Sequence, residues 1–197
     1  MNKNINNLGT FILNSCKDVT NHEIINNELI ITTKISKIYN LLDKLKNMDD
    51  LNFEMLLDIT AVDYPQRSKR FELVYILLSL KNHLRLRVKI FLNDNEIVPS
   101  ISKLYKSAGW YEREVWDMYG VSFSGNNDLR RILTDYGFEG YPLRKDFPLT
   151  GFVELRYDES KKKVVYSKVK LTQDYRNFDF LSPWEGGTLP GDEKADN

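Results

Sequence analysis

The sequence predicts an α+β fold in which helices pack on a mixed, largely antiparallel sheet, followed by an irregular extended C-terminal segment. Apolar residues repeat at helical spacing in residues 8–48, whereas residues 55–92 contain strand-like segments. Helices that precede adjacent strands give this fold class. The chain has 197 residues, of which 42% are hydrophobic, and this is enough to form one core. Residues 172–197 lack periodicity, which predicts the extended segment.

Two amphipathic helices are expected before the main strands. The apolar face of the first contains Leu8, Phe11, Ile12, Cys16 and Val19. A free cysteine on such a face is expected to be buried and unreactive. A short strand is expected at residues 28–33. The stripe of the second helix contains Ile35, Ile38, Leu41, Leu42, Leu45 and Met48, with lysines opposite.

Three further strands are expected at residues 55–64, 71–80 and 84–92. The last of these alternates strictly, so one face is buried and the other is wet. The break at residues 81–83 is short enough for a hairpin, which makes the last two strands antiparallel, with the apolar 71–80 strand central. The wet face of the last strand contains Arg85, Arg87 and Lys89, which suit either an ordinary solvated sheet or a nucleic-acid surface.

Residues 109–171 contain most of the side chains that could take part in catalysis or binding. After a short helical stretch from Ser100, a helix is expected at residues 110–119, with Gly120 as its C-terminal cap. Within it, Arg113 and Asp117 are four residues apart and are expected to pair, while Glu112 and Glu114 flank the arginine. An arginine between carboxylates keeps them ionised.

An arginine-rich and proline-rich stretch follows this helix. Asn127 or Asp128 is expected to cap a short helix that contains Arg130 and Arg131, a pair suited to binding carboxylate or phosphate. Residues 141–151 have two prolines around Arg144, Lys145 and Asp146, which predicts an ordered extended loop. Two strands, at residues 152–157 and 164–170, end this part. Aromatic and arginine side chains in irregular backbone are typical of protein interfaces.

Composition excludes several classes of function. Lysine plus arginine equals aspartate plus glutamate at 28 each, so the basic surplus of a nucleic-acid binder is missing. The single cysteine and two histidines, His22 and His83, do not make a cysteine-rich metal cage. Both histidines are expected to be surface residues. No metal, catalytic or cofactor-binding residue is therefore predicted in this chain.

One alternative from another class stays open at this point. Glu112, Glu114 and Asp117 lie close in sequence and suit the acid and base of a small hydrolase. That alternative needs a carboxylate with a raised pKa in a cleft. Pairing of these side chains with arginines, outside an enclosed pocket, removes its basis.

An ordered series of motifs then resembles the 30-kilodalton subunit of respiratory complex I, called NADH dehydrogenase subunit 9 in the mitochondrial type. The matching blocks are residues 112–119, 128–133, 135–140 and 142–151, and the resemblance continues through residues 153–158 and 178–185. The signature and interface residues expected from these blocks are Glu112, Arg113, Glu114, Trp116, Asp117, Tyr119, Arg130, Arg131, Arg144, Lys145, Asp146, Phe147, Pro148, Phe178 and Trp184.

The resemblance implies a noncatalytic core scaffold in the quinone-binding module of the peripheral arm, docked against the 49-kilodalton subunit. It implies a complex that uses NADH and ubiquinone, with FMN and iron–sulfur clusters held in other subunits. It also implies a position on the matrix side of the mitochondrial inner membrane or, alternatively, the cytoplasmic side of a bacterial one, reached only through the complex. The chain departs from the family at Asn126 and Tyr141, where histidine is usual.

These arguments divide the chain into three parts. Residues 1–108 are expected to form the α+β core domain. Residues 109–171, the signature segment, are expected to pack on that core and on partner subunits through short helices, ordered loops and two strands. Residues 172–197 are expected to form an extended partner-binding tail.

Overall fold

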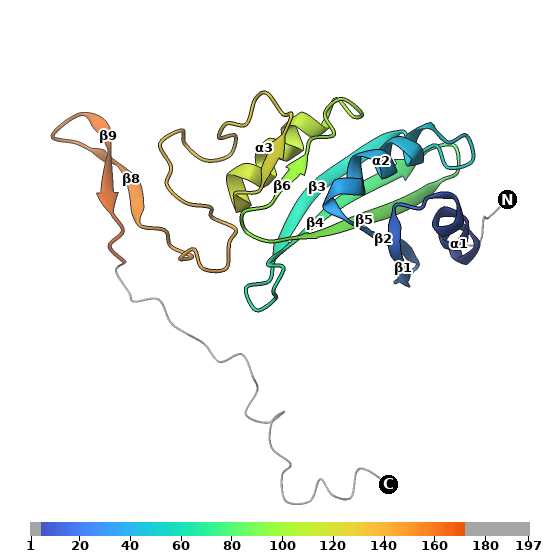
Figure 1. The fold of residues 1–197 in the computed structure, drawn as a ribbon. Helices are drawn as coiled ribbons and strands as arrows, with labels where there is room; N and C mark the ends of the chain where they lie inside the picture. Colours follow the sequence, from blue (N-terminus) through green and yellow to red (C-terminus); the bar gives the residue numbers. More distant parts are fainter. Residues whose placement is uncertain (1–4, 172–197) are drawn as a thin grey trace, which may run out of the picture. The chain divides into compact units, whose positions relative to one another are not determined.

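The computed structural model describes residues 5–171. The chain divides into two compact units, residues 1–149 and residues 150–197. The first unit contains a five-stranded sheet, a two-stranded sheet and three α-helices, and the second contains a two-stranded hairpin (Figure 1). The first unit thus includes the predicted α+β core together with residues 109–149 of the signature segment.

The main sheet has the order β1-β2-β5-β4-β3. Its strands are β1 (Val19–Ile25), β2 (Glu28–Thr33), β3 (Met55–Asp63), β4 (Phe71–Ser79) and β5 (Leu84–Leu92). All neighbours are antiparallel except β2 and β5, which are parallel. The prediction of a mixed, largely antiparallel α+β fold is therefore confirmed. β4 lies between β5 and β3, and β5 is the middle strand.

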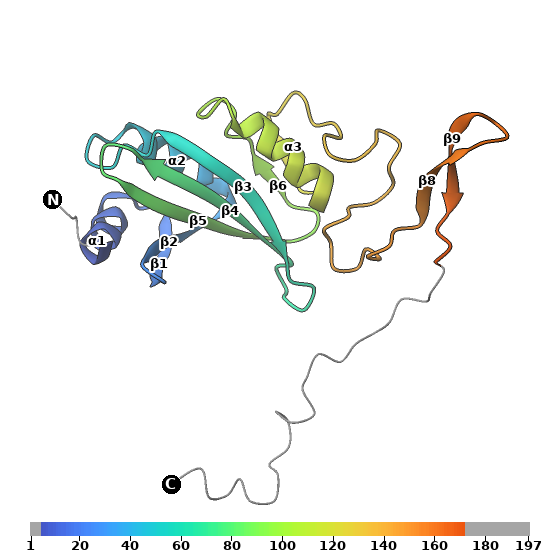
Figure 2. The same ribbon diagram turned by 180° about the vertical axis from the view of Figure 1, so that it is seen from behind.

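One face of the sheet contributes to the core. From β4 and β5 the buried side chains on this face include Leu73, Tyr75, Leu77, Val88 and Ile90. Helix α2 (Ile38–Asn47), preceded by the single turn η1 (Ile35–Lys37), packs Leu41, Leu42 and Leu45 into the same cluster. Seen from behind, β3, β4 and β5 lie in front of α2, so α2 covers one face of the sheet (Figure 2).

The first helix is shorter than predicted. α1 (Ile5–Ser15) ends before Cys16, and Val19 begins the strand β1 instead of continuing the helix. The sequence did not predict β1, because it is a polar edge strand with most of its side chains exposed. Its apolar and polar residues therefore do not alternate. Cys16 is fully buried in the core as predicted. Burial also raises the pKa of the Cys16 thiol, which suits an unreactive cysteine.

Helix α3 (Ala108–Tyr119) packs against β3. The strand before it, β6 (Ile97–Pro99), and the strand after it, β7 (Ser122–Ser124), pair in a small parallel sheet. The helical stretch expected from Ser100 is wrong, because turns occupy residues 102–107 up to the start of α3. The predicted end is confirmed: Gly120 caps α3 with a φ of 79°, and its N–H donates to the carbonyl of Trp116.

In the described part of the second unit, residues 150–171, β8 (Val153–Asp158) and β9 (Lys163–Lys168) form an antiparallel hairpin. The two strands predicted here are confirmed to within two residues. Register pairs Leu155 with Tyr166 and Tyr157 with Val164, so these four side chains lie on one face. Within residues 5–171, no helix is long and apolar enough to span a membrane.

Candidate subunit-docking segment

Asp117 on α3 organises the segment that follows the helix. Its carboxylate is fully buried and accepts hydrogen bonds from the backbone N–H groups of Ile132, Leu133 and Thr134 and from the Thr134 hydroxyl. The Arg131 guanidinium adds an ion pair, with 2.9 Å between Nη1 and Oδ1. One carboxylate therefore fixes the backbone of residues 131–134 against the end of α3.

The pKa of Asp117 reflects this arrangement. Burial alone would raise it, but hydrogen bonds from Thr134 and Ile132 and the contact with Arg131 outweigh burial and hold the pKa well below its usual range. Asp117 is thus a fixed anion. An acid or base that must exchange a proton near neutral pH needs the opposite shift.

These contacts correct two predictions. Arg113 does not pair with Asp117; its guanidinium donates to the carbonyls of Arg130 and Arg131, with Asp128 at 3.7 Å. The short helix expected around Arg130 and Arg131 does not form, since residues 128–134 are irregular. The physical reason is that the N–H groups of residues 132–134 bond to Asp117, which takes the place of the carbonyl partners that a helix would use.

Arg131 joins several parts of the signature segment. Besides Asp117, it donates to the carbonyls of Phe138 and Gly140. Its guanidinium also lies 5.2 Å from the ring centroid of Trp116 and 5.3 Å from that of Tyr141. Such a planar cation satisfies several carbonyls and rings at once. Arg130, in contrast, is exposed, and its ion pair within residues 5–171 is with Asp128, at 2.7 Å.

Glu112 lies in a separate environment, on the buried side of α3. It accepts hydrogen bonds from the Ser100 hydroxyl, the Ile101 N–H and the Asn126 side-chain amide, each at 2.8 Å. The expectation that a neighbouring arginine lowers the pKa of Glu112 is wrong. Burial raises its pKa, and the hydrogen bonds only partly offset this.

The three carboxylates of α3 therefore do not form an acid and base pair. Glu112 is fully buried beneath the helix, Asp117 is enclosed by residues 131–134, and Glu114 is exposed. Glu112 has the raised pKa that the hydrolase alternative requires. However, its carboxylate has no exposed surface for a substrate and is occupied by three donors. The geometry gives the hydrolase alternative no support.

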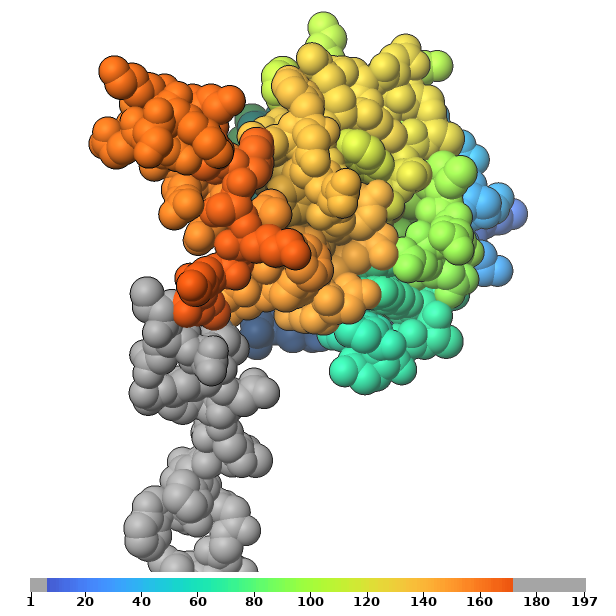
Figure 3. Space-filling model, turned by 90° about the vertical axis from the view of Figure 1, so that its left-hand side faces the viewer, coloured from blue at the N-terminus to red at the C-terminus, as the bar shows by residue number. Residues whose placement is uncertain are grey.

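Arginine contacts tie the loop of residues 141–147 to neighbouring turns of the first unit. Arg144 donates to the carbonyl of Tyr119, pairs with Asp94 at 2.8 Å and lies over the Tyr141 ring. Figure 3 shows the yellow and light-orange loop against the green turn near residue 94 and the teal β3–β4 turn. Arg144 therefore forms its ion pair within the chain.

A second group of ion pairs and hydrogen bonds joins the loop of residues 141–147 to the main sheet. Asp63, fully buried at the end of β3, binds the Arg70 guanidinium through both carboxylate oxygens, at 2.7 and 2.8 Å, and accepts the N–H of Lys145. Arg70 also pairs with Asp146 at 2.9 Å. The contact with Arg70 lowers the pKa of Asp63. Sequence analysis missed Asp63, Arg70 and Asp94, since they lie 50 or more residues from their partners in this loop.

The remaining signature residues divide between packing and surface. Phe147 packs on Phe138, with ring centroids 5.8 Å apart, and the Tyr119 ring meets Phe71 edge-on at 6.5 Å. Pro148 is half-buried. Lys145 contributes its backbone N–H, and among residues 5–171 no carboxylate lies within 4 Å of its ammonium. Phe178 and Trp184 lie outside the described residues.

Gly120 is required by this packing, which gives a first prediction. A Cβ at Gly120 would lie 2.6 Å from Nη2 of Arg144 and 2.6 Å from Tyr141. Gly120→Ala is expected to lower the free energy of unfolding by about 2 kcal/mol or more, because strain at positive φ adds to this collision. Urea denaturation measures the change.

Gly125 is the matched control for this prediction. It also has positive φ, at 87°, but a Cβ there meets nothing within 4 Å. Gly125→Ala should cost only the backbone strain, about 1 kcal/mol. Equal losses for the two variants would contradict the proposed collision at Gly120.

Several large apolar side chains of this segment remain exposed. Trp110 is 64% exposed, Leu133 64%, Tyr136 79%, Leu143 51% and Leu149 81%. The neighbouring arginines Arg113, Arg131 and Arg144 have hydrogen-bond or ion-pair partners within the chain. Exposed aromatic and leucine side chains in such numbers are typical of interaction surfaces.

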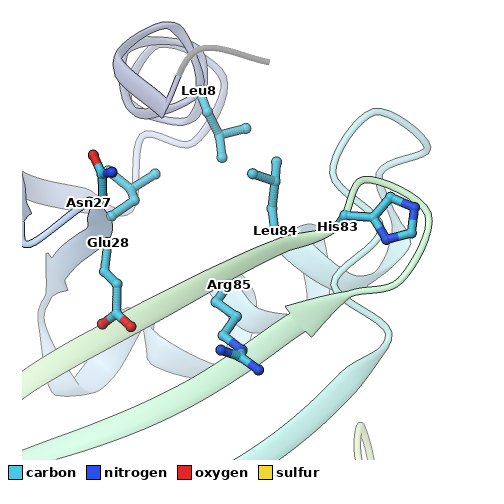
Figure 4. Close-up of a pocket in the computed structure, with 7 residues that line it drawn as sticks. Leu8, Asn27, Glu28, His83, Leu84 and Arg85 are labelled. Carbon is cyan, nitrogen blue, oxygen red and sulfur yellow. The ribbon is translucent and has the colours of Figure 1, made fainter. Parts of the chain in front are cut away.

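The pockets add no catalytic chemistry. A cavity of about 270 Å³ lies between α1, the β1–β2 turn and the β4–β5 turn. In Figure 4, Leu8 and Leu84 point toward one another across it, while the His83 ring points away. His83 lies in the predicted turn, whereas His22 lies in β1. Across residues 5–171, no cluster of three histidine, cysteine, aspartate or glutamate side chains suits a metal ion.

Comparison with known families decides the classification. The family model described as respiratory-chain NADH dehydrogenase, 30 Kd subunit, matches residues 31–153. The chain belongs to this family. The 30 Kd subunit family match begins within β2 and covers β3, β4, β5, all of α3 and the arginine-linked loops. It confirms the resemblance inferred from the signature blocks.

Two bacterial proteins of similar length agree with this family. The chain is 54% identical over 198 residues to a subunit of the NADH-quinone oxidoreductase of Paramagnetospirillum magneticum, covering 99% of this chain and all of that protein. It is 53% identical to the corresponding subunit from Parvibaculum lavamentivorans over the whole of both chains. Similarity to members of the 30 Kd subunit family therefore extends along the entire chain.

A solved structure agrees at greater distance. A chain from the membrane-bound sulfane sulfur reductase, an archaeal respiratory membrane complex, superposes with a TM-score of 0.64 and 30% identity. The match covers 81% of this chain and 98% of that one. The 30 Kd subunit fold therefore also occurs in a respiratory complex with a different name.

Proposed function

We propose that this chain is a noncatalytic core scaffold of the proton-translocating NADH:ubiquinone oxidoreductase, in the quinone-binding module of the peripheral arm. Its relatives of 53% and 54% identity are subunits of NADH-quinone oxidoreductase. In this proposal the chain contributes to electron transport from NADH to quinone by holding neighbouring subunits in place, and the 49-kilodalton subunit is its principal partner.

The hairpin β8–β9 is the observation that supports docking most strongly. One face presents five apolar side chains, each more than half exposed: Val153, Leu155, Tyr157, Val164 and Tyr166. An isolated two-stranded hairpin is marginally stable in water, so a hairpin with an apolar face needs a surface to pack on. A partner subunit supplies that surface in the proposed assembly.

The arginine contacts support a scaffold over a catalytic role. Three guanidinium groups donate hydrogen bonds or form ion pairs with carbonyls or carboxylates of this chain: those of Arg113, Arg131 and Arg144. We propose that FMN and the iron–sulfur clusters are held by other subunits, since one cysteine and two histidines do not supply a cluster's ligands.

The three-part organisation and the location belong to the same proposal. Residues 1–108 serve as the folding core, residues 109–171 bind core and partners, and residues 172–197 extend the partner contact. Attachment is to the matrix side of the mitochondrial inner membrane or, as the bacterial relatives favour, to the cytoplasmic side of a bacterial inner membrane. In either case the complex provides the membrane association.

Charge reversal at Arg144 tests the scaffold role. Arg144→Glu breaks the pair with Asp94 and the bond to the Tyr119 carbonyl, so the loop of residues 141–147 loses its anchor. We expect assembled complex to fall about fivefold or more, with NADH:quinone turnover per assembled complex unchanged. Native gel electrophoresis gives the amount, and activity of the purified complex gives the turnover.

Lys103→Glu is the control for this variant. Lys103 is exposed, and no carboxylate of the described residues lies within 4 Å of it. It should leave both quantities unchanged. Normal assembly of Arg144→Glu with reduced turnover would point to a catalytic contribution and overturn the scaffold role.

A further inference from the structure

A cleft of about 680 Å³ lies at the end of the main sheet where the parallel strands β2 and β5 finish. The β3–β4 turn and the start of β6 reach the same end, because β4 begins opposite the last residue of β5. This end borders the loop of residues 141–147, since Ile97 also lines a hollow with Tyr141 and Arg144. The residues that matter for binding are Ile35, Phe91, Ile97 and Pro99 on the apolar side and Lys34 and Lys69 on the charged side.

The apolar part of the cleft is unusually open to solvent at one residue. Ile97 is 59% exposed although it lies in a strand, and Phe91 beside it is half-buried. An apolar side chain from another molecule would bury this surface. The gain would be about 25 cal/mol for each Å² removed from water.

The polar part of the cleft contains two cations, Lys34 and Lys69, together with the carboxylate of Glu96 and several hydroxyl groups. The Thr20 hydroxyl donates to the carbonyl of Thr32, and the Thr33 hydroxyl donates to the carbonyl of Asp18. Glu96 accepts the N–H of Asn93, which fixes its carboxylate in the β5–β6 turn. These groups are engaged within the chain.

The two lysines are not engaged in this way. Lys34 and Lys69 are exposed, and no carboxylate among residues 5–171 lies within 4 Å of either ammonium. Most other cations on the main sheet have such a partner: Lys89 pairs with Glu72 at 2.7 Å, and Arg70 pairs with Asp63. As far as residues 5–171 are concerned, the two lysines of the cleft are therefore available to carboxylates from elsewhere.

We propose that this cleft is a second docking site, which receives an acidic segment of a neighbouring subunit with an apolar side chain at its centre. The apolar side chain packs on Phe91 and Ile97, and flanking carboxylates lie beside Lys34 and Lys69. The inference rests on the proposed function, since it requires the chain to be assembled with other subunits. A protein segment fits better than a small polar ligand, because the cleft lacks the buried, converging polar groups that fix such ligands.

Photocrosslinking in the assembled complex tests this docking site. The photoreactive residue p-benzoylphenylalanine replaces Ile97, the complex is purified and irradiated, and the adduct is located by mass spectrometry. We expect an adduct on another subunit, in a peptide with aspartate or glutamate within a few residues of the labelled position. Lys34→Glu with Lys69→Glu should lower the adduct yield about fivefold, and Lys34→Arg with Lys69→Arg should preserve it.

Leu80 provides the matched control position. It is 51% exposed and lies in the β4–β5 turn, at the opposite end of the sheet. The same photoreactive residue there should not label the same peptide. An assembled complex without an adduct at residue 97, or with an adduct in a segment that lacks acidic residues, overturns the docking site alone. Failure of the chain to copurify with the complex overturns the proposed function as well.

Discussion

Asp117→Asn is expected to lower the free energy of unfolding by about 3 to 5 kcal/mol, the cost of breaking a buried ion pair. The amide keeps the size of the carboxylate but leaves the largely buried Arg131 without its anion. Whichever way the amide turns, its NH₂ group faces donors, either the N–H groups of residues 132–134 or the Arg131 guanidinium. Urea denaturation measures the loss, and amide hydrogen exchange at residues 132–134 localises it.

Glu114→Gln is the control for this effect. Glu114 lies on the same helix but is exposed, so its neutralisation should change stability by less than about 0.5 kcal/mol. A comparably small loss for Asp117→Asn, with protected amides at residues 132–134, would show that Asp117 does not organise this segment.

The stabilising effect of ionised Asp117 should also be visible in the pH dependence of the free energy of unfolding. The folded-state pKa of Asp117 lies below its usual value, so the unfolded chain binds the proton more readily. Its stabilising contribution is complete above the ordinary aspartate pKa of about 3.9 and is lost as pH falls from there through the folded pKa. Asp63 acts in the same direction. In Asp117→Asn, the decline in stability below about pH 4 should be shallower than in the unaltered chain.

Much of the core could be predicted from the sequence because local pattern and tertiary packing agree there. The alternation of residues 84–92 places Leu86, Val88 and Ile90 in the core of β5, as observed. Gly120 marks the end of α3, since only a residue tolerant of positive φ suits that cap. In these places each residue's environment is set by its near neighbours in sequence.

The errors lie where distant groups override local preference. Asn127, Asp128 and the two arginines after them have the pattern of a capped helix, yet Asp117 takes the N–H groups that such a helix would use. Likewise, the spacing pairs Arg113 within its own helix, but Arg113 binds carbonyls 17 and 18 residues away. Contacts of this range leave no periodic signal, so the sequence identifies the residues of the docking segment but not most of their partners.

The hairpin β8–β9 carries the second large expected effect. Leu155→Asp with Tyr166→Asp places two carboxylates on a directly opposed pair of the apolar face, where they repel each other and resist burial. We expect the amount of assembled complex to fall by about tenfold or more. Each buried charge should weaken binding by about as much free energy as the loss of one interface hot-spot residue. The stability of residues 1–149 should not change, since they form a separate compact unit.

Arg156→Asp tests whether the face, and not the added charge, is responsible. Arg156 lies on the same strand but pairs with Val165 on the opposite face of the hairpin. This variant should assemble close to normally. Any general effect of acidic substitutions on expression or solubility would appear in both variants and so would be recognised.

The yield of purified NADH-quinone oxidoreductase from cells that carry these hairpin variants, with turnover per complex, tests the scaffold role most directly. The expected result is a loss of complex for Leu155→Asp with Tyr166→Asp, near-normal yield for Arg156→Asp, and unchanged turnover in whatever complex assembles. A normal yield of active complex containing the double variant would contradict the account that this chain docks through its hairpin as a structural subunit.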